Sequence, residues 1–175
     1  WERVYSATRV PNSVVYNGVD LKIYTPGGVG EPPTDAYRVL MVEGSLAGGY
    51  ERGLDSGVHL VELLNQAGLD RSVELMVAGK VSEGLKRAWE GRTKIRIQWA
   101  GLVPQAEIPA LDRSAHLLYS ADLNAACPNS VVEALACGLP VVAFDTGALA
   151  ELAPAGAGRV VPYGGDPWKL DPPDI

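Results

Sequence analysis

Short apolar runs alternate with amphipathic stretches along most of this chain. The run over residues 38–44 ends at a glycine and is typical of a strand buried on both faces. Further strands are predicted at residues 73–79, 94–101, 116–122, 141–144 and 159–163. Helices are predicted at residues 56–67 and 81–90, and others beginning near 104 and 130. This alternation predicts an α/β fold, a doubly wound and mostly parallel Rossmann-like sheet with right-handed crossovers.

The part of the chain before the first buried strand has a different pattern. Ser13–Asp20 places an apolar run before Asn17 and Gly18, a pair that favours a tight turn, so a short strand and a turn are predicted. Residues 25–37 are rich in glycine and proline and are expected to form an exposed loop. We expect residues 1–175 to form a single domain.

Residues 127–144 combine a loop, a short helix and a buried strand, and this stretch is the main candidate for a ligand site. Ser130 and Glu133 have the spacing of a capping box, so a helix is expected to begin near Ser130. Gly138 suits the left-handed position after the last turn. Free backbone N–H groups at the start of such a helix attract anions.

Glycine is frequent in residues 45–57, which follow the first buried strand and contain one arginine, Arg52. A loop of this composition could cradle phosphate oxygens, but its spacing matches neither a Walker loop nor G-x-G-x-x-G. Ordinary turn chemistry and a solvated arginine remain equally good interpretations. In a parallel sheet the loop over residues 44–53 would meet three others at the carboxyl ends of the strands. Those three are residues 101–104, 125–130 and 145–151.

The composition is that of an ordinary globular domain, with 47% hydrophobic and 21% charged residues. A net charge of -6 without a basic cluster argues against nucleic-acid binding. No segment is apolar enough to span a membrane, so any peripheral membrane association would involve regions outside this chain. Cys127 and Cys137 are expected ~15 Å apart, too far for a disulfide, and reduced cysteines favour a cytoplasmic location. Because the sequence starts at Trp1, we expect it to be a piece of a longer protein.

Taken in order, these motifs resemble the C-terminal, donor-binding domain of retaining glycosyltransferases with the GT-B fold, of the family 4 or group 1 type. The segments that carry the resemblance are VVYNGVD, VEGSLAGGYERGLD, VELMVAGK, IQWAGLVP, CPNSVVEALACGLPVVAFDTGALAEL and GRVVPYGGDP. The resemblance implies a nucleotide-sugar donor linked to UDP, GDP or ADP as the substrate, with no cofactor. It also implies a partner, the missing N-terminal domain of the same enzyme, which would bind the acceptor.

The sequence departs from the family's pattern at two positions. The family motif is Glu, seven residues, Glu, in which the second glutamate contacts the ribose and the first contacts the donor sugar. Glu133 matches the second position, but the first falls on Ala125. Ser45 stands where the family usually has an arginine, and Arg52 with Gly53 answers the family's Lys-Gly after a loop two residues longer.

The resemblance also implies roles for individual residues. Sugar transfer leaves a diphosphate whose developing charge must be stabilised, and preorganised donors can do this without a metal. Arg52 and the N–H groups of Ser130, Val131 and Val132 are assigned that role, with Arg52 and Glu133 as the catalytic residues. No Asp-x-Asp motif occurs, so metal-independent transfer is expected. The other expected substrate-binding residues are Gly44, Ser45, Leu102, Val103, Ala125, Asn129 and Gly147.

Several alternatives stay open from the sequence. Glu133 could be only the capping-box partner of Ser130, and Glu151 could either cap a turn or face the donor. His59 and His116 have no acidic or cysteine partner at ligand spacing and are expected to be surface or core histidines rather than catalysts. A GT-B sugar-nucleotide epimerase would need additional acid and base residues near the diphosphate, and the sequence shows none there. A non-catalytic nucleotide-binding module is the third possibility, and the chain alone is expected to be inactive.

Overall fold

The strands form one parallel sheet, as the sequence predicts for a doubly wound fold. The computed structural model describes residues 13–46, 51–169, 171 and 173, with the side chains of residues 51 and 52 left out. The described strands are β1 (Ala36–Ser45), β2 (Ser72–Lys80), β3 (Ile97–Gly101), β4 (Leu117–Ser120), β5 (Val141–Phe144) and β6 (Gly158–Val161). Their spatial order is β3-β2-β1-β4-β5-β6, and every pair is parallel. The predicted α/β fold is therefore confirmed.

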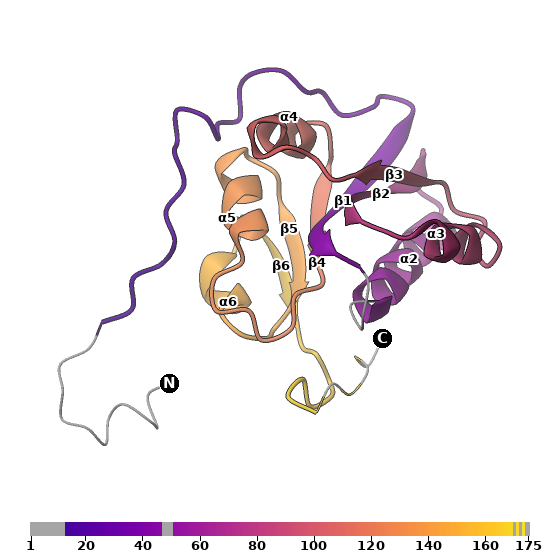
Figure 1. The fold of residues 1–175 in the computed structure, drawn as a ribbon. Helices are drawn as coiled ribbons and strands as arrows, with labels where there is room; N and C mark the ends of the chain where they lie inside the picture. Colours follow the sequence, from indigo (N-terminus) through magenta and orange to yellow (C-terminus); the bar gives the residue numbers. More distant parts are fainter. Residues whose placement is uncertain (1–12, 47–50, 170, 172, 174–175) are drawn as a thin grey trace.

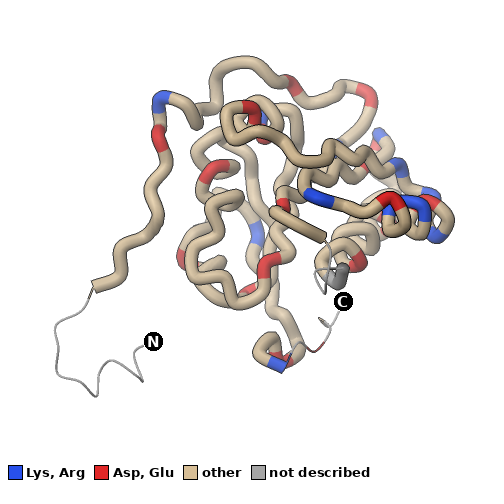
Figure 2. Tube along the Cα trace, in the orientation of Figure 1, with Lys and Arg blue, Asp and Glu red and all other residues tan. Residues whose placement is uncertain are grey.

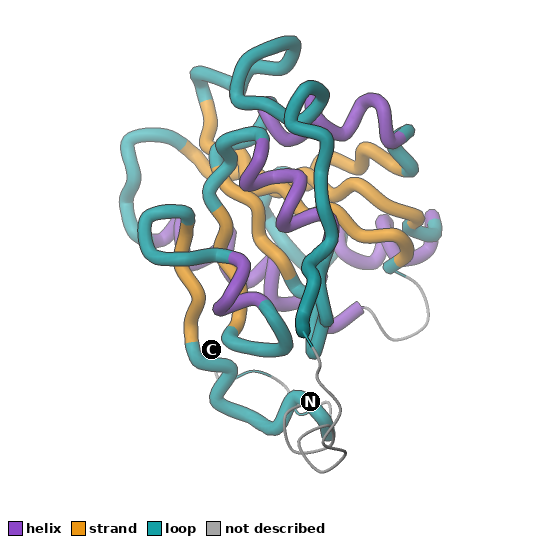
Figure 3. Tube along the Cα trace, turned by 90° about the vertical axis from the view of Figure 1, so that its left-hand side faces the viewer, coloured by secondary structure: helices purple, strands orange, loops and turns teal. Residues whose placement is uncertain are grey.

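Helices cover both faces of the sheet (Figures 1 and 3). α2 (Glu51–Gln66) and α3 (Glu83–Glu90) lie on one face, whereas α4 (Ile108–Arg113), α5 (Asn129–Ala136) and α6 (Leu149–Leu152) lie on the other. A single 3-10 turn, η2 (Gln105–Glu107), leads into α4. Among the described residues, none of the helices has both the length and the apolar character needed to cross a membrane.

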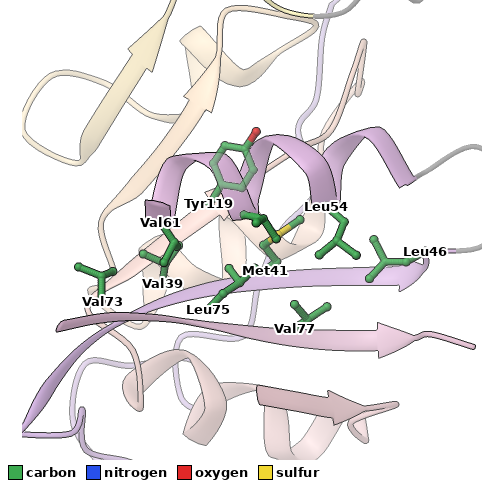
Figure 4. Close-up of a cluster of buried hydrophobic side chains, with 10 residues drawn as sticks. Val39, Met41, Leu46, Leu54, Val61, Val73, Leu75, Val77 and Tyr119 are labelled. Carbon is green, nitrogen blue, oxygen red and sulfur yellow. The ribbon is translucent and has the colours of Figure 1, made fainter. Parts of the chain in front are cut away.

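Alternate residues of β1 build two separate cores. Val39 and Met41 point toward α2 and pack with its apolar face (Figure 4). Leu40 points to the other face, where it packs with residues of α5 and β5. Burial of each such side chain stabilises the fold by about 1.5–3 kcal/mol. The central strands are thus buried on both faces, as their apolar runs predict.

The N-terminal segment differs from its prediction. Residues 13–20 form neither helix nor strand, so the predicted strand is wrong. Their apolar side chains are mostly exposed, and the segment lies beside α5 rather than along a sheet edge. The loop over residues 25–37 has no regular structure up to Asp35, and its last two residues begin β1. The Arg113 guanidinium fastens this loop by donating to the carbonyls of Thr25 and Val29.

The glycine-rich loop is shorter than predicted, because α2 begins at Glu51 and takes in residues 51–57. Two glycines inside this helix allow it to approach the sheet. A Cβ on Gly57 would lie 2.5 Å from the Met41 sulfur, and one on Gly53 would lie 2.6 Å from the Ala121 Cβ. Close packing, rather than a phosphate cradle, therefore explains these two glycines.

α5 begins at Asn129, one residue before the predicted start, and its N-cap residue is Pro128. The capping-box prediction is wrong, because Ser130 lies inside the first turn and no side chain caps the helix. The C-terminus is as predicted. Gly138 has φ 79°, and the N–H groups of Gly138 and Leu139 donate to Leu135 and Ala134, which is a Schellman arrangement.

Candidate functional site

A cavity opens where the strand order reverses between β1 and β4. Sheets of this kind bind ligands at such a switch point, outside the carboxyl ends of the strands. The cavity has a volume of about 410 Å³. Six of the predicted site residues line it, namely Gly44, Leu102, Val103, Asn129, Ser130 and Glu133. Its other lining residues are Val42, Glu43, Ala78, Gly79, Ile108, Asp122 and Pro128.

The remaining predicted residues lie outside the lining of this cavity. Ser45 ends β1, and Val131 is fully buried in the core beneath α5. Arg52 is in the first turn of α2, but its side chain is outside the described part of the chain, so its predicted role stays a prediction. Glu151 is exposed on α6 and accepts a hydrogen bond from the Tyr16 hydroxyl.

The four amide groups in the first turn of α5 differ in their hydrogen bonding. The N–H groups of Val131 and Val132 both donate to the Pro128 carbonyl, at 3.2 and 3.3 Å. The amides of Asn129 and Ser130 have no backbone acceptor among the described residues, and both residues line the cavity. The anion-binding capacity of this helix start therefore lies with Asn129 and Ser130 rather than with the two valines.

Glu133 stands between two cavities. It lines the cavity at the strand ends and also a second cavity of about 590 Å³. The second cavity is lined by Gly18, Val19, Asp20, Ile23, Tyr24, Gln105, Ala106, Asn129, Val132 and Glu133. The pKa of the Glu133 carboxyl is raised, because the effect of burial is larger than the opposing effect of the adjacent Tyr24 hydroxyl. A partly buried carboxylate at this place can accept hydrogen bonds from hydroxyl groups of a ligand.

Two acidic residues of the site have no signal in the sequence. Glu43 lies within the apolar run of β1, and Asp122 follows β4, yet both line the cavity at the strand ends. Burial and the nearby Asp122 raise the pKa of Glu43 to about 7, and burial also raises the pKa of Asp122. Within the described part of the chain, no three His, Cys, Asp or Glu side chains are grouped so as to hold a metal ion.

Gly147 shapes the loop in front of α5 rather than the cavity itself. It has φ 57°, and a Cβ added there would lie 2.3 Å from the Ala125 carbonyl oxygen. The N–H of the next residue, Ala148, donates to that same oxygen at 2.9 Å. The loop that carries Ala125 is thus held by direct backbone contact with the turn after β5.

Gly147→Ala is therefore expected to lower the free energy of unfolding by about 2 kcal/mol, because it adds a backbone clash to the left-handed strain. Gly68→Ala is the matched control, since Gly68 has φ 71° with nothing within 4 Å of an added Cβ. The control should cost only about 1 kcal/mol. Urea denaturation of both variants measures the difference, and equal losses would show that the Ala125 contact is unimportant.

A family model described as "Glycosyl transferases group 1" matches residues 37–170. No curated protein matches the chain. Many solved structures have similar folds, and three of them illustrate the likeness. The first is sucrose-phosphate synthase from Thermosynechococcus elongatus, with a TM-score of 0.65 and 20% identity over 97% of this chain and 44% of that one.

The second similar structure is the apo form of the lipopolysaccharide outer core galactosyltransferase WaaB. Its TM-score is 0.63 and its identity 20%, over 97% of this chain and 48% of that one. The third is the C-terminal domain of a group 1 family protein, LpcC, from Francisella tularensis. It has a TM-score of 0.58 and 16% identity, over 87% of this chain and 84% of that one. The chain thus spans less than half of the first two proteins and most of an isolated C-terminal domain.

Proposed function

Because the chain belongs to the group 1 glycosyl transferases, we propose that it binds a nucleotide-sugar donor for retaining, metal-independent transfer of the sugar to an acceptor. One observation carries the proposal. A single cavity at the switch point brings together the end of β1, the loop after β3 and the first turn of α5. These are the places where a sheet of this topology presents backbone groups to a nucleotide.

Each part of the cavity suits one part of such a donor. The Asn129 and Ser130 amides at the start of α5 would donate to the diphosphate. The Glu133 carboxylate would accept from the ribose hydroxyls, and the main chain around Leu102 and Val103 would hold the base. The fold matches that of C-terminal GT-B domains, so an N-terminal domain would complete the acceptor side.

Titration of this chain with UDP, GDP, ADP and their sugar-linked forms tests the proposal. We expect one nucleotide series to bind, and Glu133→Ala to weaken that binding at least about tenfold, because hydrogen bonds to a charged group are worth about 1.5–3 kcal/mol. Isothermal titration calorimetry measures the nucleotide affinity of the unchanged chain and of Glu133→Ala. Glu133→Gln keeps the size of the side chain and should show a smaller loss.

Glu107→Ala is the matched control for this experiment. Glu107 is exposed on η2, close to the site, and lines neither cavity. Its replacement should leave the affinity unchanged. If Glu133→Ala and Glu107→Ala bind equally well, Glu133 does not contact the ligand, and failure of every nucleotide to bind would refute the donor-site proposal.

A second candidate function is supported by the acidic residues of the cavity. A sugar-nucleotide epimerase would need additional acid and base groups near the diphosphate. The sequence indicates none, but in the structure Glu43 and Asp122 line the cavity. Incubation of the chain with the nucleotide sugar that binds, followed by sugar analysis, separates the two functions. An epimerised sugar would favour this second candidate over sugar transfer. Binding of the nucleotide sugar without any reaction would instead fit a non-catalytic module, which Ala125 in the place of the family's glutamate permits.

A further inference from the structure

The cavity at the strand ends is lined by acidic rather than basic side chains. Three of its lining residues are titratable, namely Glu43 on β1, Asp122 after β4 and Glu133 on α5. No lysine or arginine among the described residues lines it. Basic positions gather instead around α3 and the loop that follows it (Figure 2). A diphosphate entering this cavity therefore meets carboxyl groups whose charge matters for its binding.

Glu43 lies at an irregularity in β1 and lines the cavity. Val42 pairs with Ala78 and Ser45 pairs with Lys80, so Glu43 and Gly44 together oppose the single residue Gly79. This two-to-one pairing is a β-bulge, which changes the direction of side chains and often lies beside active sites. Val42, Glu43 and Gly44, at and beside this bulge, all line the same cavity.

The bulge depends on the glycine that faces it. Gly79 has φ 146°, and a Cβ there would lie 2.3 Å from the Glu43 carbonyl oxygen. β2 can therefore approach β1 closely at this point only because Gly79 has no side chain. The half-buried Glu43 carboxyl makes no hydrogen bond or ion pair with any described residue. It is a positioned acidic group whose hydrogen-bonding capacity is unused within the described protein.

We propose that the Glu43 side chain controls how strongly this cavity binds the negatively charged diphosphate of a nucleotide sugar. As a neutral acid, it donates a hydrogen bond to a diphosphate oxygen of the bound nucleotide sugar, and as a carboxylate it repels that oxygen. This inference rests on the proposed donor site and names a residue that controls it. The proton comes from solvent, so binding above the pKa of Glu43 takes up a proton and becomes weaker as the pH rises.

Several titratable groups surround Glu43 and affect how its charge depends on pH. Asp122 favours the neutral form of Glu43 because like charges repel, and Glu133 adds a third carboxyl to the lining. Tyr119 on β4 has a pKa raised to about 12 by burial and stays neutral. Lys80 on β2 is exposed, pairs with Ser45 and does not line the cavity. The Arg52 side chain on α2 lies outside the described residues.

The test measures the affinity for UDP-glucose, GDP-mannose and ADP-glucose by calorimetry between pH 5.5 and pH 8.5. The diphosphate of a nucleotide sugar is fully ionised over this range, so only the protein titrates. For the probe that binds, we expect the affinity to fall with a slope approaching tenfold per pH unit above pH 7. Glu43→Gln keeps a hydrogen-bond donor without the charge, and its affinity should vary less than threefold.

Glu107→Gln serves as the matched control and should keep the profile of the unchanged chain. Proton uptake offers a second measurement that needs no variant. Titration at pH 7.5 in two buffers of different ionisation enthalpy should show uptake of 0.5–1 proton by the unchanged chain and none by Glu43→Gln. Thermal unfolding confirms that each variant is folded.

The possible results separate the inference from the proposed function. A flat profile for the unchanged chain, or a Glu43→Gln profile as steep as that of the unchanged chain, would overturn the role of Glu43 and leave the donor site standing. A profile that Asp122→Asn flattens and Glu43→Gln does not would also overturn it. If none of the three nucleotide sugars binds at pH 5.5, both the donor site and the inference fail.

Discussion

Asp112→Asn is expected to raise the free energy of unfolding by up to about 4 kcal/mol above pH 7 and to leave it almost unchanged at pH 3.5. Asp112 lies in α4 with only 1% of its surface exposed, and neither carboxyl oxygen has a hydrogen-bond partner in the described structure. Burial, together with the nearby Glu133 carboxylate, raises the pKa of Asp112 from 3.8 to about 7.

The direction of this effect follows from proton binding. Between pH 3.8 and pH 7 the folded chain holds a proton on Asp112 that the unfolded chain has lost, so the folded state loses stability as the pH rises through this range. Above pH 7 the full loss is present. An asparagine carries no charge in either state and removes this part of the pH dependence.

Chemical denaturation of both proteins at several pH values measures the difference. Asp145→Asn is the control, because Asp145 is exposed and makes no side-chain hydrogen bond among the described residues. Its stability should follow that of the unchanged chain at every pH. Parallel curves for Asp112→Asn and the unchanged chain would show that Asp112 is not protonated preferentially in the fold.

The sequence contains good signals for the sheet and weak signals for the acidic groups. The apolar runs of β1 and β5 predict their burial directly, and Gly138 marks the end of α5, because these features depend on local chemistry. Asp112 is different. An aspartate in a predicted helix is normally solvated, and only the packing of α4 against α5 shows that this one is buried.

Glu43 illustrates why part of the site could not be predicted. Its sequence neighbours place it within a strand, and its place beside the cavity coincides with a bulge that faces Gly79, 36 residues later in the chain. The register between two strands is not visible in either segment alone. The cavity residues that could be predicted, such as Ser130 and Leu102, lie on loops and a helix start whose place follows from topology.

The glycines of α2 led to a wrong prediction for a related reason. Glycine favours turns in an isolated segment, so the sequence predicts one loop over residues 45–57. In the fold, Gly53 and Gly57 face Ala121 and Met41 across a helix–sheet contact that has no space for a Cβ. Close packing and turn formation require the same residue, and the sequence alone does not separate them.

Arg38→Met is expected to lower the free energy of unfolding by about 3–5 kcal/mol, because it leaves a buried charge without its main partner. Glu74 on β2 is 2% exposed and accepts from the Arg38 Nε at 2.7 Å. Gln98 also donates to Glu74, at 2.8 Å, and the mostly exposed Arg96 lies 3.3 Å away. Arg38 additionally donates to the Ser114 carbonyl, so its loss would also remove a contact with the segment that leads into β4.

Two further variants make this prediction specific. Arg96→Met removes an exposed guanidinium from the same carboxylate and should cost less than about 1 kcal/mol. The double variant Arg38→Met with Glu74→Leu removes both buried charges and should recover most of the loss, because apolar residues can replace a buried ion pair at little cost. Equal losses for Arg38→Met and Arg96→Met, or a double variant no more stable than Arg38→Met, would contradict the argument. Since Arg38 lies near the start of β1 and the cavity lies at the other end of this strand, nucleotide-sugar affinity should stay unchanged in every variant that remains folded.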